Sequence, residues 1–127
     1  MSHRSPLGRA RGLGSAKQGV HHFWVQRVSA VALIPLGLWF VFSIALLAAK
    51  GASYEAVSHW VAAPSVAVTL VLFLAAAFYH GALGLQVVIE DYVPQNGAKI
   101  TLLLLTKFVA AAAAATGIFA VLKIALS

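Results

Sequence analysis

The chain has 127 residues, of which 61% are hydrophobic and 9% are charged, with a formal net charge of +6 and no cysteine. A soluble domain is about half apolar and roughly a quarter charged, so this composition excludes an ordinary soluble domain and indicates a membrane protein. The lack of cysteine excludes disulfides, iron–sulfur clusters ligated by this chain and covalently attached c-type haem. The basic residues lie at the ends of apolar blocks, which favours the lipid bilayer as the partner and not nucleic acid.

Residues 1–24 form a polar N-terminal segment that is rich in glycine and arginine and contains no acidic residue. An organelle transit peptide has a similar composition, so location in a mitochondrial inner membrane is a less favoured alternative. A secretory signal fits poorly, because the apolar block that follows is too long for its hydrophobic region. We interpret the segment as the cytoplasmic tail of a multi-pass protein of a bacterial inner membrane.

Three long apolar blocks follow the tail, and the only charged residue inside them is Lys107, in the third block. Each block exceeds the roughly 18 residues that distinguish a membrane-spanning helix from a buried core helix. None alternates with a period of two, and an open sheet would leave backbone groups unpaired in hydrocarbon. The predicted fold class is therefore an all-α integral membrane protein with three transmembrane helices. These spans are predicted at about 25–49, 64–90 and 99–124, within one membrane domain of residues 25–127.

The third span contains a run of small residues, from Ala110 to Ala115, followed by Thr116 and Gly117. In lipid, helices associate through close packing, and small side chains allow their backbones to approach. We expect this run to be a helix–helix contact.

The distribution of arginine and lysine predicts the orientation. With three spans, the N-terminal tail and the second loop share one side of the membrane and hold six basic residues, whereas the other side holds two. The positive-inside rule then places the N-terminus in the cytoplasm and the C-terminus outside. The six residues are Arg4, Arg9, Arg11, Lys17, Arg27 and Lys99, and the two are Lys50 and Lys123.

The second span contains a histidine, His80, far from either end. It precedes Glu90 by a helix length of roughly 15 Å, which puts it inside a hydrocarbon core of about 30 Å. Its helical neighbours Ala76, Ala77 and Gly84 are small and leave room for a flat group beside the imidazole. Ionisable residues at this depth indicate a functional site, and three uses stay open: haem ligation, a proton path, or a hydrogen bond to another helix. A haem would need its second axial ligand from a partner chain.

Further polar residues lie where the first span begins and the second span ends. Arg27 and His21 stand at the start of the first span, where an arginine is ordinarily a positive-inside anchor, although it could also face an anionic group such as a haem propionate. Asp91 and Tyr92 end the second span. They could form a polar helix end with an interfacial tyrosine, or the tyrosine hydroxyl could hydrogen-bond a ligand carbonyl at the membrane edge.

Two motifs carry a family resemblance. His80, Gly84, Asp91 and Tyr92 follow the pattern H-x3-G-x6-D-Y, and the sequence GVHHFWVQRVSA, residues 19–30, opens the first span. Together they resemble the hydrophobic membrane anchor of succinate dehydrogenase, the smaller of its two cytochrome b-type subunits. The motifs cover about the first three-quarters of the chain, and the three-helix plan covers the rest.

The resemblance implies roles for five residues. His80 would be one axial ligand, and hence the metal-binding residue, of a haem b whose other ligand comes from the larger cytochrome b-type subunit. Tyr92 would hydrogen-bond ubiquinone beside Asp91, and Arg27 and His21 would lie by the haem propionates.

The same resemblance implies partners and a function. The three helices would pack into a bundle with the second cytochrome b-type subunit, and the pair would dock a flavoprotein and an iron–sulfur subunit. Electrons from succinate would then reach ubiquinone at the cytoplasmic edge, and the chain would not be an enzyme on its own. Two alternatives from other classes are a small subunit of a transporter or channel that uses His80 as a proton relay, and a structural anchor without a ligand.

Overall fold

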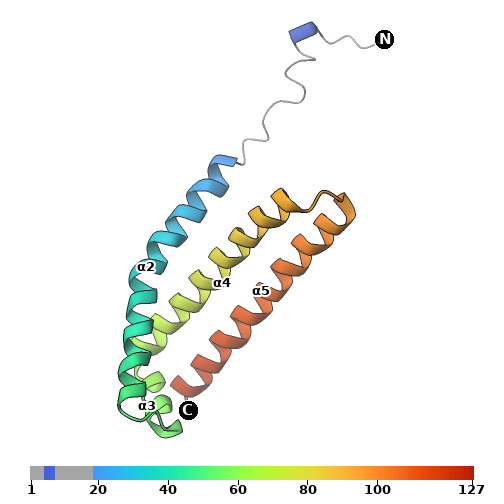
Figure 1. The fold of residues 1–127 in the computed structure, drawn as a ribbon. Coiled ribbons are helices and arrows are strands. Elements are labelled where there is room, and N and C mark those ends of the chain that lie inside the picture. The colour runs from blue at the N-terminus through green and yellow to red at the C-terminus, as the bar shows by residue number, and fades with distance from the viewer. Residues whose placement is uncertain (1–4, 8–18) are drawn as a thin grey trace.

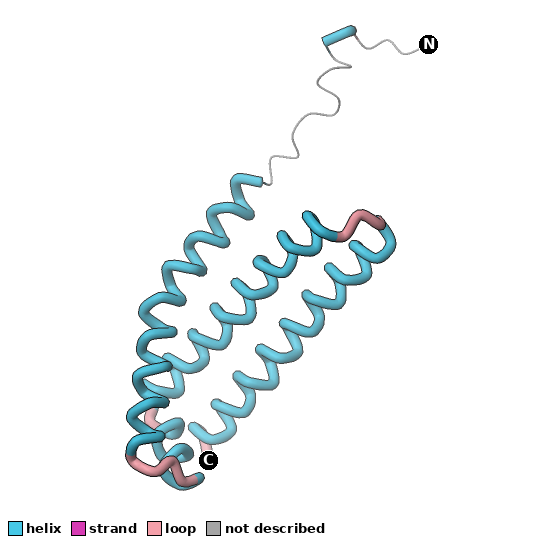
Figure 2. Tube along the Cα trace, in the orientation of Figure 1, coloured by secondary structure: helices cyan, strands magenta, loops and turns pink. Residues whose placement is uncertain are grey.

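The structure is a computed structural model that describes residues 5–7 and 19–127. Three long helices run side by side in alternating directions, and a short helix lies at one end of the bundle (Figures 1 and 2). No strand occurs within the described ranges. In chain order the helices are α2 (Gly19–Ala49), α3 (Tyr54–Ala62), α4 (Pro64–Tyr92) and α5 (Asn96–Ala125).

The long helices α2, α4 and α5 are each long and apolar enough to cross a membrane, which confirms the predicted all-α fold with three spans. Their lengths are 31, 29 and 30 residues. At 1.5 Å per residue each helix is roughly 45 Å long, which exceeds a hydrocarbon core of about 30 Å. The helix ends therefore reach the polar boundary or the helices tilt.

The helix ends extend beyond the predicted ones. α2 begins at Gly19 and not near residue 25, α4 ends at Tyr92 and not at residue 90, and α5 begins at Asn96 and not at residue 99. Hydropathy marks the part of a helix that lies in lipid, whereas polar residues such as His21 can continue the helix into the interface. The rest of the predicted tail falls mostly on residues 1–4 and 8–18, outside the described residues, together with Arg4, Arg9, Arg11 and Lys17.

The short helix α3 was not predicted. It begins after Ser53, whose hydroxyl oxygen accepts a hydrogen bond from the backbone N–H of Ala56 at 3.1 Å, as an N-cap does. Its Trp60 stacks on Trp39 of α2, with 5.9 Å between ring centroids, and Val61 is buried. Because α3 packs against both α4 and α5, it closes this end of the bundle.

The central helix is α4, which packs against α5 and against α2. On the α2 side, Phe40 stacks on Phe73 with 4.7 Å between ring centroids. On the α5 side, a Cβ placed on Gly117 would lie 3.3 Å from a methyl group of Leu74, so the backbone approaches closely there. The predicted helix–helix contact of the small-residue run is confirmed at this glycine.

The buried core is small and lies entirely at the α3 end of the bundle. It belongs to α3, the first turns of α4 and the last turns of α5. In the half of the bundle that contains His80, none of the described residues is buried. The four buried side chains are Val61, Ala67, Leu70 and Val121.

Candidate haem and quinone site

The start of α2, the end of α4 and the start of α5 meet at one end of the bundle, opposite α3 (Figure 1). This arrangement gathers His21, Arg27, Asp91 and Tyr92 at a single end, as three alternating spans require. The C-terminus lies at the other end, beside α3 (Figure 1).

His80 lies on the side of α4 that faces α2, and its ring is half-buried. Its Nδ1 is 3.0 Å from the hydroxyl oxygen of Ser29, a residue 51 positions earlier in the chain. The Ser29 hydroxyl also donates a hydrogen bond to the backbone carbonyl of Gln26 at 3.0 Å. Among the described residues no group hydrogen-bonds Nε2, the second nitrogen of the His80 ring.

These features fit a histidine that ligates a metal. Such a histidine usually has one ring nitrogen held by a hydrogen bond while the other carries the lone pair that the metal accepts. Space is open at Gly84, one helical turn from His80, since a Cβ placed there would meet no atom within 4 Å. No group of three or more histidine, cysteine or acidic side chains in the described part of the chain could hold a metal ion. His80 therefore belongs to no such group, and a haem at this position would be shared with another chain.

The end of α4 is held by polar contacts around Glu90. Its carboxylate accepts a hydrogen bond from the Gln86 side-chain amide at 2.8 Å. Its backbone carbonyl accepts one from the Lys99 ammonium group at 3.1 Å, which ties α4 to α5 across the three-residue loop at 93–95. Asp91 is exposed and Tyr92 is 81% exposed, and no hydrogen bond to either side chain occurs within the described residues. The Tyr92 hydroxyl is therefore free to bond a ligand.

The side chains of Arg27 and His21, both near the start of α2, have different surroundings. The exposed Arg27 guanidinium lies over the ring of Phe23 on the same helix, 5.1 Å from its centroid. His21 instead lines a recess of about 620 Å³ between α2 and α4, together with His22, Gln86 and Glu90. Both residues thus lie at the same end of the bundle, but only His21 lines the recess beside the end of α4.

A family model described as succinate dehydrogenase/fumarate reductase transmembrane subunit matches residues 1–114. The chain belongs to this family.

Relatives named succinate dehydrogenase hydrophobic membrane anchor subunit are similar in sequence to this chain over most of the chain's length. The protein of Rickettsia bellii is 34% identical over 104 residues, which are 82% of this chain and 82% of the relative. The protein of Rickettsia conorii is 30% identical over 105 residues, with the same coverage of both chains. The protein of Paracoccus denitrificans is 31% identical over 126 residues, which are 99% of this chain and 95% of the relative.

As a member of the succinate dehydrogenase/fumarate reductase family, the chain is a multi-pass membrane subunit of an enzyme complex. It associates with the membrane and with other subunits of that complex. The family resemblance that the two motifs indicated is therefore confirmed.

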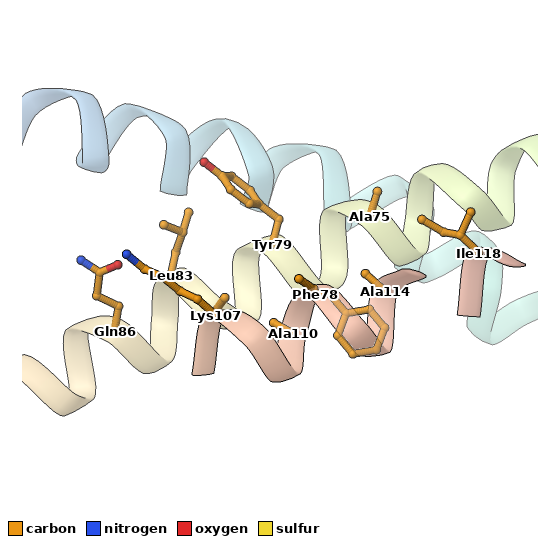
Figure 3. Close-up of a pocket in the computed structure, with 11 residues that line it drawn as sticks. Ala75, Phe78, Tyr79, Leu83, Gln86, Lys107, Ala110, Ala114 and Ile118 are labelled. Carbon is orange, nitrogen blue, oxygen red and sulfur yellow. The ribbon is translucent and has the colours of Figure 1, made fainter. Parts of the chain in front are cut away.

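Sequence analysis missed an apolar groove of about 390 Å³ between α4 and α5 in this family member (Figure 3). Its walls are mostly small or apolar side chains. The Lys107 side chain runs along the groove from α5 toward the same end of the bundle as Gln86 (Figure 3). The amine of this intramembrane lysine thus extends toward the polar boundary, as snorkelling requires. The groove is lined by Ala75, Phe78, Tyr79, Ala82, Leu83, Gln86, Lys107, Ala110, Ala111, Ala114 and Ile118.

Proposed function

We propose that the chain is the hydrophobic membrane anchor of a bacterial succinate dehydrogenase, with its N-terminus in the cytoplasm. Relatives with that name match the chain over 82% and 95% of their own length. In this proposal it pairs with a larger cytochrome b-type subunit, and the two anchor an iron–sulfur subunit and a flavoprotein. The complex transfers electrons from succinate to ubiquinone.

In this proposal His80 would supply one ligand of haem b, and the larger subunit would supply the other. The main support for haem ligation is the hydrogen bonding of the His80 ring. Ser29 bonds Nδ1, whereas Nε2 has no hydrogen-bond partner among the described residues. A bound haem would supply a one-electron carrier in the membrane.

Tyr92 and Asp91 contribute to the quinone site in this proposal. Tyr92 lies at the last turn of α4 with an exposed hydroxyl, at the boundary end where Arg27 and His21 also stand. Its hydroxyl can donate a hydrogen bond to a quinone carbonyl, whereas an ionised Asp91 can only accept. Arg27 and His21 would place positive charge or hydrogen-bond donors near the haem propionates, although no contact among the described residues joins Arg27 to His80.

The deciding experiment is an optical spectrum of the purified complex that carries His80→Leu. Leucine offers no lone pair to iron, so we expect the b-type band of the reduced-minus-oxidised spectrum to be lost or strongly weakened. His59→Leu is the matched control, because His59 is exposed and lies on α3 at the opposite end of the bundle. An unchanged band in His80→Leu would remove His80 as a ligand, and a wild-type complex with no b-type band would favour a proton relay or a purely structural anchor.

A further inference from the structure

We propose that Ser29 is a positioning residue for His80: its hydroxyl fixes the tautomer and the direction of the imidazole, so that Nε2 faces the metal with its lone pair free. This inference rests on the proposed haem ligation by His80. Ser29 lies on α2 and His80 lies on α4, so the contact between these two helices would orient the metal ligand.

The tautomer follows from what each atom can donate. The Ser29 hydroxyl carries one hydrogen and lies 3.0 Å from two atoms, the Gln26 carbonyl oxygen and His80 Nδ1. A carbonyl oxygen can only accept, so the hydroxyl hydrogen is used there. The arrangement that satisfies both contacts places a hydrogen on Nδ1, which donates to the serine oxygen. A neutral imidazole with its hydrogen on Nδ1 carries its lone pair on Nε2.

The alternative tautomer would leave one of the two hydrogen bonds at Ser29 unmade. With the hydrogen on Nε2, the lone pair of Nδ1 would compete with the Gln26 carbonyl for the single hydroxyl hydrogen, and one acceptor contact would be lost. Few other groups surround the ring, because a Cβ placed on Gly84 would meet no atom within 4 Å and Ala76 and Ala77 are small. Within the described residues, Ser29 is thus the polar group that orients the ring.

The hydrogen bond also has an electronic effect. When the ring N–H of a metal-bound histidine donates to an oxygen, the other nitrogen becomes more basic and a stronger ligand. A stronger donor stabilises ferric iron more than ferrous iron. Loss of the Ser29 hydroxyl should therefore weaken haem retention and raise the reduction potential of the haem. Loss of a hydrogen-bond partner of a metal-binding histidine typically lowers metal affinity by about 10–100-fold.

The test compares Ser29→Ala, Ser29→Thr and Ser29→Cys in the intact purified complex. For Ser29→Ala we expect haem transfer to apomyoglobin to be at least roughly 10-fold faster, the midpoint potential to rise, and the low-spin ferric EPR spectrum to shift. Ser29→Thr keeps a hydroxyl that can bond back to the helix. Its haem transfer rate, midpoint potential and EPR spectrum should therefore equal those of the wild type. Ser29→Cys has a weaker acceptor and should fall between Ser29→Ala and the wild type, so it tests the idea if the alanine variant fails to assemble.

Thr69→Val is the matched control, since Thr69 is a hydroxyl residue whose side chain donates to the backbone carbonyl of Ser65 at 2.8 Å, in the part of α4 near α3. It should leave haem release, potential and EPR spectrum unchanged. If Ser29→Ala or Ser29→Cys matched this control while His80→Leu lost the haem, the role of Ser29 would be refuted and the proposed ligand would stand. If His80→Leu kept the haem, the proposed function itself would fail, and the role of Ser29 with it.

Discussion

Removal of the Tyr92 hydroxyl separates quinone binding from the packing of the chain. The Tyr92 side chain is 81% exposed and its hydroxyl has no hydrogen-bond partner within the described residues. Tyr92→Phe therefore breaks no hydrogen bond among the described residues, and we expect its effect to come from a lost bond to a ligand or a partner. One neutral hydrogen bond contributes about 1 kcal/mol net, and more where its loss leaves a buried acceptor unpaired.

A loss of about 1 kcal/mol in the transition state lowers a rate by roughly fivefold. We therefore expect Tyr92→Phe to lower quinone reductase activity by about fivefold or more. Electron transfer from succinate to an artificial soluble acceptor should be spared, because that reaction bypasses the membrane site. Both activities are measured on the same purified complex, so the ratio between them corrects for differences in assembly.

The matched control is Tyr54→Phe, which removes the hydroxyl of a tyrosine that is 84% exposed on α3, at the opposite end of the bundle. Its quinone reductase activity should equal that of the wild type. The reasoning would be refuted if Tyr92→Phe kept full quinone reductase activity, or if it lowered both activities equally. Tyr92 would then be only an interfacial aromatic residue.

Two further predictions concern topology and packing. A tag at the N-terminus should be accessible only from the cytoplasm and a tag at the C-terminus only from outside, because α2 begins and α5 ends at opposite ends of the bundle; labelling of both tags from one side of intact cells would contradict this. Gly117→Leu should lower the thermal-unfolding midpoint of the detergent-solubilised complex, at a cost of about 1–3 kcal/mol, because even a Cβ there lies 3.3 Å from Leu74. Gly37→Leu, where a Cβ would meet no atom of this chain within 4 Å, is its control, and equal midpoints would show that the α4–α5 contact tolerates the larger side chain.

The three spans could be predicted because their signal is local: each is a long apolar run, and length alone separates it from a core helix. The helix ends could not be predicted as well, since polar residues such as His21 and Asn96 belong to helices that continue past the apolar run. The short helix α3 had a readable signal in Ser53, an N-cap residue followed by Glu55 in the first turn, but its nine residues are too few to stand out between two long apolar runs.

The candidate site shows the same division between local and distant information. His80 could be singled out because an imidazole in an uncharged run is conspicuous in the sequence itself. Ser29 could not, because its partner lies 51 residues away on another helix and serines in helices commonly bond only to their own backbone. The contact of Arg27 with Phe23 is local to α2, but which side chains of α2 face α4 depends on the rotation of α2 about its axis, which the sequence pattern leaves open.

The position of the small core has a consequence for how the subunit is assembled. All four buried side chains lie beside α3, so apolar packing among the described residues is tightest at that end. At the His80 end, hydrogen bonds between Ser29 and His80 and from Lys99 to the Glu90 carbonyl join the helices, but no described side chain there is buried. The apolar surface at that end must therefore be covered by lipid or by other chains. We expect the spacing of the helices around His80 to depend on the partner subunits more strongly than their spacing beside α3 does.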